Sequence, residues 1–186
     1  MPILAKETSL YPCDLLDRYL DGTATESAWW ALYTRSRREK ELARRLVSQD
    51  VAFYLPTTER RHRSPAGRIR TTHEPLFPGY VFLCGDDESR RIALATSCVS
   101  TCFPVHDGRE LAVDLQQISR LSEVGETISP ELELGEGTPV RVLSGPFEGF
   151  KGEVVRRQGQ HRLVVAVHFM QQGASVQLED CDLEKL

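Results

Sequence analysis

The sequence lacks a long uncharged apolar run, although 40% of its 186 residues are hydrophobic. Because a helix needs about 20 mostly apolar residues to cross a membrane, we expect no membrane contact. Residues 1–16 also lack a basic region followed by an apolar core, which is the pattern of a secretory signal. These two absences favour a cytoplasmic protein.

Residues that build catalytic or metal sites are few and scattered. The five cysteines are an odd number without a disulfide pattern, and Cys98 and Cys102 alone make a poor zinc site. The five histidines are dispersed, and the glycines of "GEGTP" lack the Lys-Ser/Thr that completes a phosphate loop. We therefore expect no enzyme activity, no metal and no cofactor.

Charge of one sign is concentrated in one part of the chain, although the net charge is only −4. Residues 35–70 hold eleven Arg or Lys and four Asp or Glu, a net of +7. Residues 1–27 have a net charge of −3 and residues 126–186 a net charge of −4. The arginine-rich segment favours contact with a polyanion, although a solvated helix and hairpin would show the same run.

The spacing of apolar residues predicts an α+β domain up to residue 125. Aromatic and β-branched stretches indicate strands, and apolar stripes three and four residues apart indicate helices. Because the links are short, we expect an antiparallel four-stranded sheet flanked by helices. The expected elements are a strand at 28–34, a helix from 36, extended chain from 52, a basic hairpin with arms 57–63 and 68–74, a strand through 80–83, a helix at 86–97, a strand at 98–105 and a helix at 114–125.

Two of these helices begin with a capping pattern. Ser36 is followed three residues later by Glu39, and Asp114 by Gln117, so that the first side chain of each pair can cap its helix. In the first helix, Arg37 and Arg45 are spaced to pair with Glu41.

The stretch "HEPLFPGYVFL" at 73–83 is the most apolar and aromatic part of the chain. Pro78 and Gly79 interrupt it, although a central strand normally excludes both residues. Either the interruption bends an ordinary core strand, or the segment presents aromatic surface to a partner.

The composition changes after residue 125 to an acidic stretch with Pro and Gly, which indicates a linker. Beyond the linker, five short strands in about 50 residues predict a small barrel, because closure removes the open edges of a sheet.

Three stretches, taken in order, resemble the NusG family of transcription elongation factors. "WWALYTRSRREKELARRL" and "PLFPGYVFL" resemble its N-terminal domain, and "VRVLSGPFEGFKGEV" resembles the KOW motif of its SH3-like C-terminal barrel. The resemblance covers residues 28–186 and implies four parts, which are an N-terminal extension at 1–27, a polymerase-binding domain at 28–125, a linker at 126–136 and a KOW barrel at 137–186.

The resemblance also implies partners. The family's N-terminal domain binds the clamp helices of the largest subunit of RNA polymerase, and at the matching positions here the contact would involve Tyr33, Phe77, Pro78, Tyr80 and Phe82. Val81 and Leu83, on the alternate face, are expected in the core. The first helix and the hairpin of the family face upstream or non-template DNA, which here implies phosphate contacts by Arg35, Arg37, Arg38, Lys40, Arg44, Arg60, Arg61, Arg63, Arg68 and Arg70. For Arg35 and Arg37, base reading is an open alternative.

In the barrel, the resemblance implies that a small-subunit ribosomal protein or the termination factor Rho binds at Phe147, Phe150, Phe169 and Met170. For Phe150 and Phe169, packing in the core is an equal alternative. "HEPLFPGYVF" and "FEGFKG" are closer to RfaH-like paralogues, so we expect a specialised elongation or antitermination factor that works as a monomer. The alternatives are a general NusG and, in another class, a ribosome-associated KOW protein that binds RNA.

Overall fold

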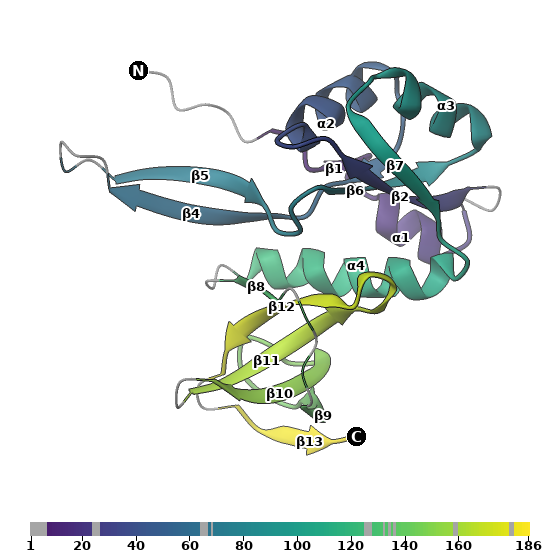
Figure 1. Ribbon diagram of the computed structural model, residues 1–186. Coiled ribbons are helices and arrows are strands. Elements are labelled where there is room, and N and C mark those ends of the chain that lie inside the picture. Colours follow the sequence, from purple (N-terminus) through teal and green to yellow (C-terminus); the bar gives the residue numbers. More distant parts are fainter. Residues whose placement is uncertain are drawn as a thin grey trace. The chain divides into compact units, whose positions relative to one another are not determined.

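The computed structural model describes residues 7–23, 27–63, 67, 69–124, 128–131, 133, 135, 137–157, 160–178 and 181–186. The chain forms two compact units, an N-terminal unit of Met1–Ala112 and a C-terminal unit of Val113–Leu186, whose elements are labelled in Figure 1. The division falls inside a helix, so the expected domain boundaries at 27, 125 and 136 stay predictions.

The N-terminal unit contains an antiparallel sheet with the strand order β1-β3-β6-β2-β7. The α+β class expected from the sequence is confirmed, with five strands in place of four. The added strand is β1, a two-residue strand that lies in the expected N-terminal extension. The strands are β1 (Leu10–Tyr11), β2 (Ala28–Thr34), β3 (Phe53–Tyr54), β6 (Tyr80–Gly85) and β7 (Val99–Pro104).

Helices α2 (Glu39–Ser48) and α3 (Asp87–Ala95) cover one face of this sheet. Their apolar sides pack on alternate residues of the strands, because successive side chains of a strand point to opposite faces. Val81 and Leu83 lie in this core, as expected. The core residues are Leu32, Leu42, Ala43, Leu46, Val51, Phe53, Leu55, Val81, Leu83, Ala93, Cys98 and Val99.

Residues before β2 also form helix α1 (Leu15–Leu20), which packs on the sheet. The Tyr19 ring contacts Trp29 edge to face, with 5.5 Å between ring centroids. The segment expected to be an extension therefore adds both a strand and a helix to the N-terminal unit.

Two of the expected helix starts are wrong. Helix α2 has Arg38 at its N-cap without a side-chain cap, and Arg37 just before it has a positive φ of 60°. The Glu39 carboxylate does not return to Ser36, because it accepts a hydrogen bond from the Gly79 N–H at 2.8 Å. Glu41 pairs with Arg38 and Arg45, and not with Arg37.

Helix α4 spans Gly108–Glu123 and thus begins six residues earlier than expected. The Asp107 side chain caps it by accepting a hydrogen bond from the Glu110 N–H at 2.8 Å. Asp114, which was expected to cap the helix, lies inside it and is buried.

Strands β4 (Thr57–Arg63) and β5 (Ile69–Pro75) form a separate two-stranded antiparallel sheet. This confirms the expected basic hairpin. Thr57 lies opposite Pro75, and Glu59 lies opposite His73.

The C-terminal unit contains the rest of α4 and a six-stranded antiparallel sheet with the order β13-β9-β10-β11-β12-β8. The small β-rich domain is confirmed, with six strands in place of five. A 3-10 turn, η1 (His168–Met170), joins β11 to β12. The strands are β8 (Ser129–Glu131), β9 (Thr138–Val142), β10 (Lys151–Arg157), β11 (Gln160–Val167), β12 (Gln172–Gln177) and β13 (Leu183–Lys185).

Glycine is required at the start of β10. A Cβ atom on Gly152 would lie 2.3 Å from the carbonyl oxygen of Val164 on β11. Because this contact is with backbone, no side-chain movement could relieve it, so the close pairing of β10 and β11 depends on a glycine here.

Candidate functional site

The interruption at Pro78–Gly79 is a turn that comes directly before β6. The Tyr80 N–H donates to the Phe77 carbonyl oxygen at 3.1 Å, with Pro78 and Gly79 between them and a φ of +86° at Gly79. Proline followed by a residue of positive φ is the pattern of a type II turn. The strand therefore begins at Tyr80, and neither Pro78 nor Gly79 has to serve inside it.

Three contacts fix this turn against its surroundings. The Gly79 N–H donates to Glu39 on α2, and the Gly79 carbonyl oxygen accepts from the Thr34 N–H at 2.7 Å. A Cβ atom on Gly79 would lie 2.8 Å from Cε2 of Tyr33. Only a glycine thus lets the Tyr33 ring lie directly against the turn.

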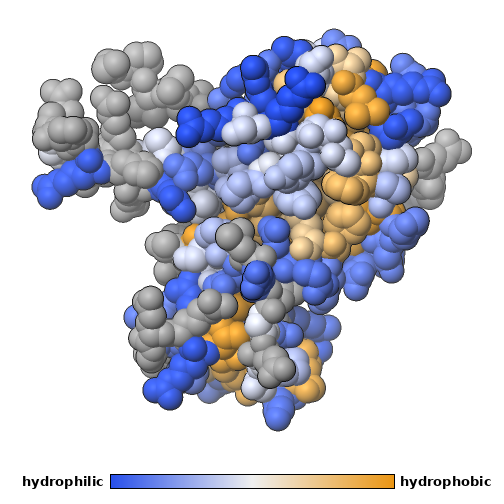
Figure 2. Space-filling model, in the orientation of Figure 1, coloured by the Kyte–Doolittle hydropathy of each residue, from blue (hydrophilic) through white to orange (hydrophobic). Residues whose placement is uncertain are grey.

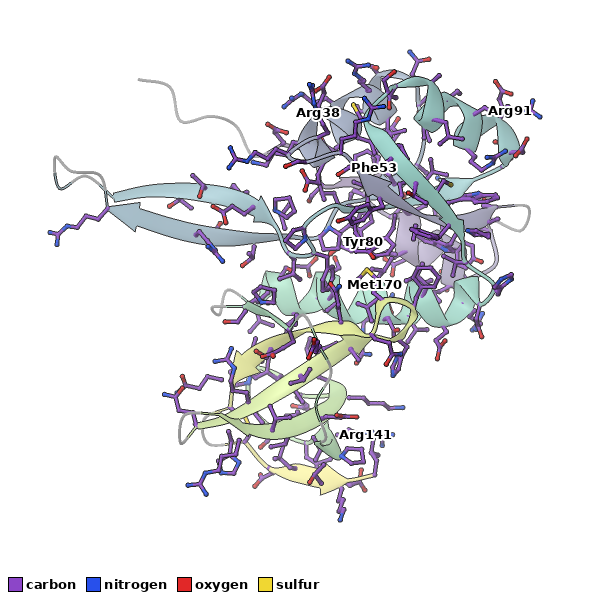
Figure 3. All side chains as sticks on the ribbon, viewed as in Figure 1. Arg38, Phe53, Tyr80, Arg91, Arg141 and Met170 are labelled. Atoms are coloured by element: carbon purple, nitrogen blue, oxygen red, sulfur yellow. The ribbon has the colours of Figure 1, made fainter. Side chains whose placement is uncertain are left out.

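The turn places two tyrosines side by side at the end of the sheet. Tyr33 on β2 pairs with Tyr80 on β6, and their rings meet edge to face with centroids 5.2 Å apart. Tyr33 is 43% exposed and Tyr80 is half-buried; Figure 3 labels Tyr80 at the start of its strand. A ring pair of this geometry contributes about 0.5–1.5 kcal/mol beyond its burial.

Other aromatic residues share this sheet face, which is opposite to α2 and α3. Ala31 lies directly opposite both Phe82 and Phe103 in the register, so these side chains are on the same face as Tyr33. Phe103 is 41% exposed, whereas Phe82 is fully buried. We call Tyr33, Pro78, Tyr80 and Phe103 the aromatic patch.

The five residues expected to bind polymerase differ in how exposed their side chains are. Tyr33 and Pro78 are exposed and Tyr80 is half-buried, but Phe77 and Phe82 are only 1% and 0% exposed. Figure 2 shows that apolar and hydrophilic side chains both occur on the visible surface of the N-terminal unit. Phe77 and Phe82 therefore lie in the interior, whereas Tyr33, Pro78 and Tyr80 contribute to the surface.

The predicted nucleic-acid residues fall into two groups by their partners. Arg44 pairs with Glu7 at 2.9 Å, Arg60 with Glu74 at 3.2 Å, and Arg38 with Glu41. The hydrogen bond from Arg38 lowers the pKa of the Glu41 carboxyl, so this pair stays charged at neutral pH.

The second group has no such partner. Within the described ranges, the side chains of Arg35, Arg37, Lys40 and Arg63 take part in no ion pair, and the three arginines are exposed. The side chains of Arg61, Arg68 and Arg70 lie outside the described part of the chain.

In the C-terminal unit, the four residues predicted to bind a partner protein also differ in exposure. Phe147 and Phe150 are buried, and their rings meet edge to face with centroids 6.2 Å apart. Phe169, in η1, is 39% exposed and its neighbour Met170 is half-buried.

The residues of η1 are tied to α4. The Asp114 carboxylate accepts hydrogen bonds from the His168 N–H and from Nδ1 of His168, both at 2.9 Å. Gln117, one turn later, accepts from the Lys151 N–H at the start of β10 at 3.2 Å. These bonds fix α4 against the C-terminal sheet at two points.

Burial raises the pKa of the Cys84 thiol to about 12, so this thiol stays protonated and unreactive at neutral pH. Among the described residues, no group of three or more His, Cys, Asp or Glu could hold a metal ion. No helix in the same part of the chain is long and apolar enough to cross a membrane.

Comparison with known proteins identifies the family of this chain. The model of the NusG family, "Transcription termination factor nusG", matches residues 27–122. The chain belongs to the NusG family. Membership of this family places the protein in transcription, and the matched segment contains the whole aromatic patch.

Similar NusG proteins extend the match to both units. A "Transcription termination/antitermination protein NusG" from Staphylococcus aureus is 30% identical over 179 residues, which cover 85% of this chain and 95% of the relative. The protein of the same name from Pseudomonas aeruginosa is 24% identical over 177 residues, covering 85% and 98%. A solved structure described as "Domain interaction in Thermotoga maritima NusG" covers 88% of this chain and 99% of its own, with 22% identity and a TM-score of 0.46. This overall structural similarity is weak, and the family assignment does not depend on it.

The sequence did not predict two residues that contribute to the aromatic patch, Glu39 and Phe103. Glu39 was interpreted as a capping residue, and nothing in its local pattern points to Gly79, forty positions away. Phe103 was assigned to a strand without a role; its alternation with Thr101 in β7 was the signal that could have placed it on the patch side.

Proposed function

We propose that this NusG-family chain is a transcription elongation factor that binds RNA polymerase through the aromatic patch. The observation that carries the proposal is the exposed Tyr33–Tyr80 pair, which the Glu39–Gly79 hydrogen bond holds in place. Exposed apolar surface on a small domain indicates a binding site, and buried tyrosines are frequent among the residues that dominate interface energy.

The proposed contact on the polymerase is the pair of clamp helices of the largest subunit. Pro78 and Phe103 would extend the contact made by the tyrosines, while Phe77 and Phe82 would keep the patch rigid from inside the unit. Bound in this way in the cytoplasm, the protein modulates pausing, termination or antitermination without chemistry of its own.

The unpaired basic residues are proposed to contact upstream or non-template DNA. Arg35, Arg37, Lys40 and Arg63 take part in no ion pair among the described residues, which makes them the first candidates. Arg38, Arg44 and Arg60 would exchange a carboxylate for a phosphate. Contacts to phosphate position a protein but read no sequence.

In the C-terminal unit, Phe169 and Met170 are proposed to bind a small-subunit ribosomal protein or Rho. Phe147 and Phe150 would support this surface from the interior, because both are buried. We favour a specialised RfaH-like factor on the two motifs that resemble those paralogues, with a general NusG as the alternative. The net charge of −4 over residues 126–186 disfavours a ribosomal RNA-binding role.

The proposal is tested by titrating the full-length chain against purified RNA polymerase core. Combined Tyr33→Ala and Tyr80→Ala substitutions should weaken binding by about 100-fold or more, since interface anchors each contribute about 2 kcal/mol or more. Leu94→Ala is the matched control, because Leu94 is 39% exposed on α3, which covers the other face of the sheet. Equal binding by the double variant and the control would show that RNA polymerase does not bind through the aromatic patch.

A further inference from the structure

The acidic extension at residues 1–27, with a net charge of −3, has no part in the proposed function. It is attached to the N-terminal unit, because β1 within it is an edge strand of the sheet. Leu10 lies opposite Tyr54 of β3, and Tyr11 lies opposite Phe53. The position of this segment is thus determined by the same sheet that α2 covers.

Two further hydrogen bonds hold the segment in place. The Leu55 N–H donates to the Ser9 carbonyl oxygen at 2.6 Å, and the Tyr11 hydroxyl donates to the Asp50 carboxylate. Glu7 is only two residues before Ser9, which is about 7 Å of extended chain. The Glu7 carboxylate is therefore confined to the surface next to this attachment.

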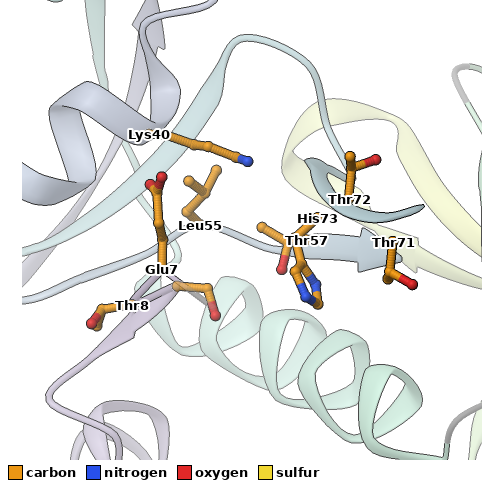
Figure 4. Close-up of a pocket in the computed structure, with 9 residues that line it drawn as sticks. Glu7, Thr8, Lys40, Leu55, Thr57, Thr71, Thr72 and His73 are labelled. Atoms are coloured by element: carbon orange, nitrogen blue, oxygen red, sulfur yellow. The ribbon is translucent and has the colours of Figure 1, made fainter. Parts of the chain in front are cut away.

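Glu7 lies against the face of α2 that carries two of the cations proposed to contact DNA. Its carboxylate pairs with Arg44 at 2.9 Å. Glu7 and Lys40 also line the same cavity, of about 130 Å³, at the base of the hairpin (Figure 4). Because residues four apart are neighbours on a helix surface, Lys40 and Arg44 present adjacent positive charges to this segment.

We propose that the N-terminal extension is an internal competitor of DNA, with the Glu7 carboxylate in the place of a phosphate at Arg44. Carboxylates and phosphates both form charge-assisted hydrogen bonds with a guanidinium, so they compete for the same donors. While Glu7 is paired, Arg44 contributes little to DNA binding. When the Glu7 side chain moves away, Arg44 adds a phosphate contact beside Lys40. The inference rests on the DNA contact of the proposed function and adds its regulation by the extension.

The exposure of the pair allows this exchange. The side chains of Arg44 and Glu7 are 61% and 40% exposed, and ion pairs of this kind are weak because water screens them. Glu7 also precedes Ser9, the first anchored residue, so its side chain can move without breaking the pairing of β1 with β3. Glu41, in contrast, is 24% exposed and pairs with two arginines at once, so it is less suited to such an exchange.

The test measures binding of the full-length chain to a fluorescein-labelled DNA duplex by fluorescence anisotropy over a range of salt concentrations. Glu7→Gln should tighten binding at low salt about two- to fivefold, which is the range that an exposed ion pair can contribute. The slope of the logarithm of the binding constant against the logarithm of the salt concentration should change from about −3.6 to about −4.5. The reason is that Arg44 joins the four cations without an ion pair among the described residues.

Two further variants separate the competition from a general effect of charge. Glu110→Gln is the matched control, because it makes the same change of charge at an exposed position on α4, and it should leave the slope unchanged. Arg44→Gln completes a double-mutant cycle with Glu7→Gln. Alone it should alter the slope little, whereas in the Glu7→Gln background it should return the slope to about −3.6.

The outcomes distinguish this inference from the proposed function. Equal slopes for Glu7→Gln and Glu110→Gln would overturn the inference and leave the DNA contact of the proposed function intact. Absence of DNA binding by the unaltered chain and by every variant would overturn both. Polymerase binding of Glu7→Gln should equal that of the unaltered chain, because Glu7 is not part of the aromatic patch. A loss of polymerase binding would show that Glu7 acts through the fold of the N-terminal unit, which would also contradict the inference.

Discussion

The residue with the most constrained surroundings at the aromatic patch is Gly79. Its N–H binds Glu39, its carbonyl oxygen binds Thr34, and its missing side chain makes room for Tyr33. Each contact joins a different element to the turn before β6. A change at this residue should therefore disturb the patch without touching an exposed residue.

Gly79→Ala should destabilise the chain by more than about 2 kcal/mol. The left-handed backbone costs an alanine about 1–2 kcal/mol, and the new methyl group would collide with the Tyr33 ring. Gly22→Ala is the control, because Gly22 has a similar φ of +78° and nothing within 4 Å of an added Cβ. Urea denaturation measures both; equal losses at the two positions would mean that Tyr33 is not held against the turn.

At the scale of elements, local patterns were sufficient where local contacts determine the structure. The hairpin and the amphipathic strands and helices followed from turn residues and periodicity. The two- and three-residue strands β1, β8 and β13 could not be predicted, because so few residues have no periodicity. Their pairing depends on neighbours that are distant in the sequence.

The predicted starts of α2 and α4 were wrong for a related physical reason. Glu39 and Asp114 both fit a capping pattern, but each carboxylate binds a backbone N–H in another element. A tertiary hydrogen bond in a buried place outweighs a local cap that water can replace. The candidate site shows the same limit, since the sequence located the aromatic cluster but not which of its rings are exposed.

Asp114→Ala should loosen the attachment of η1 to α4. Without the carboxylate, the His168 N–H loses its acceptor, so its hydrogen exchange should accelerate about tenfold or more. Glu110→Ala, at an exposed position on the same helix, is the control and should leave that exchange rate unchanged. Unchanged exchange in Asp114→Ala would show that this bond does not hold η1.

At the scale of the whole molecule, the chain separates its charges along the sequence. The segment 35–70 has a net charge of +7 within a chain of net −4. This separation suits a protein whose basic surface meets nucleic acid while its acidic C-terminal part meets a protein. The number of cations without an ion pair among the described residues predicts how strongly salt should weaken DNA binding.

A plot of the logarithm of the DNA-binding constant against the logarithm of the salt concentration should have a slope of about −3.6, if Arg35, Arg37, Lys40 and Arg63 each contact one phosphate at about 0.9 per phosphate. Arg37→Gln should reduce the magnitude of the slope by about 1, because Arg37 is exposed and has no carboxylate partner among the described residues. Arg38→Gln should reduce it less, because Arg38 is paired with Glu41. Fluorescence anisotropy over a range of salt concentrations measures all three slopes; a larger effect of Arg38→Gln would reverse this assignment.

The central claim is that the Tyr33–Tyr80 surface lies on the polymerase clamp. The most direct measurement places a photo-crosslinking phenylalanine derivative at position 80 in full-length chain bound to elongation complexes, and maps the attachment by mass spectrometry. The account predicts a crosslink to the clamp helices of the largest subunit from position 80 and none to these helices from position 94. A crosslink from position 80 to another part of the complex, with the clamp helices unlabelled, would contradict it.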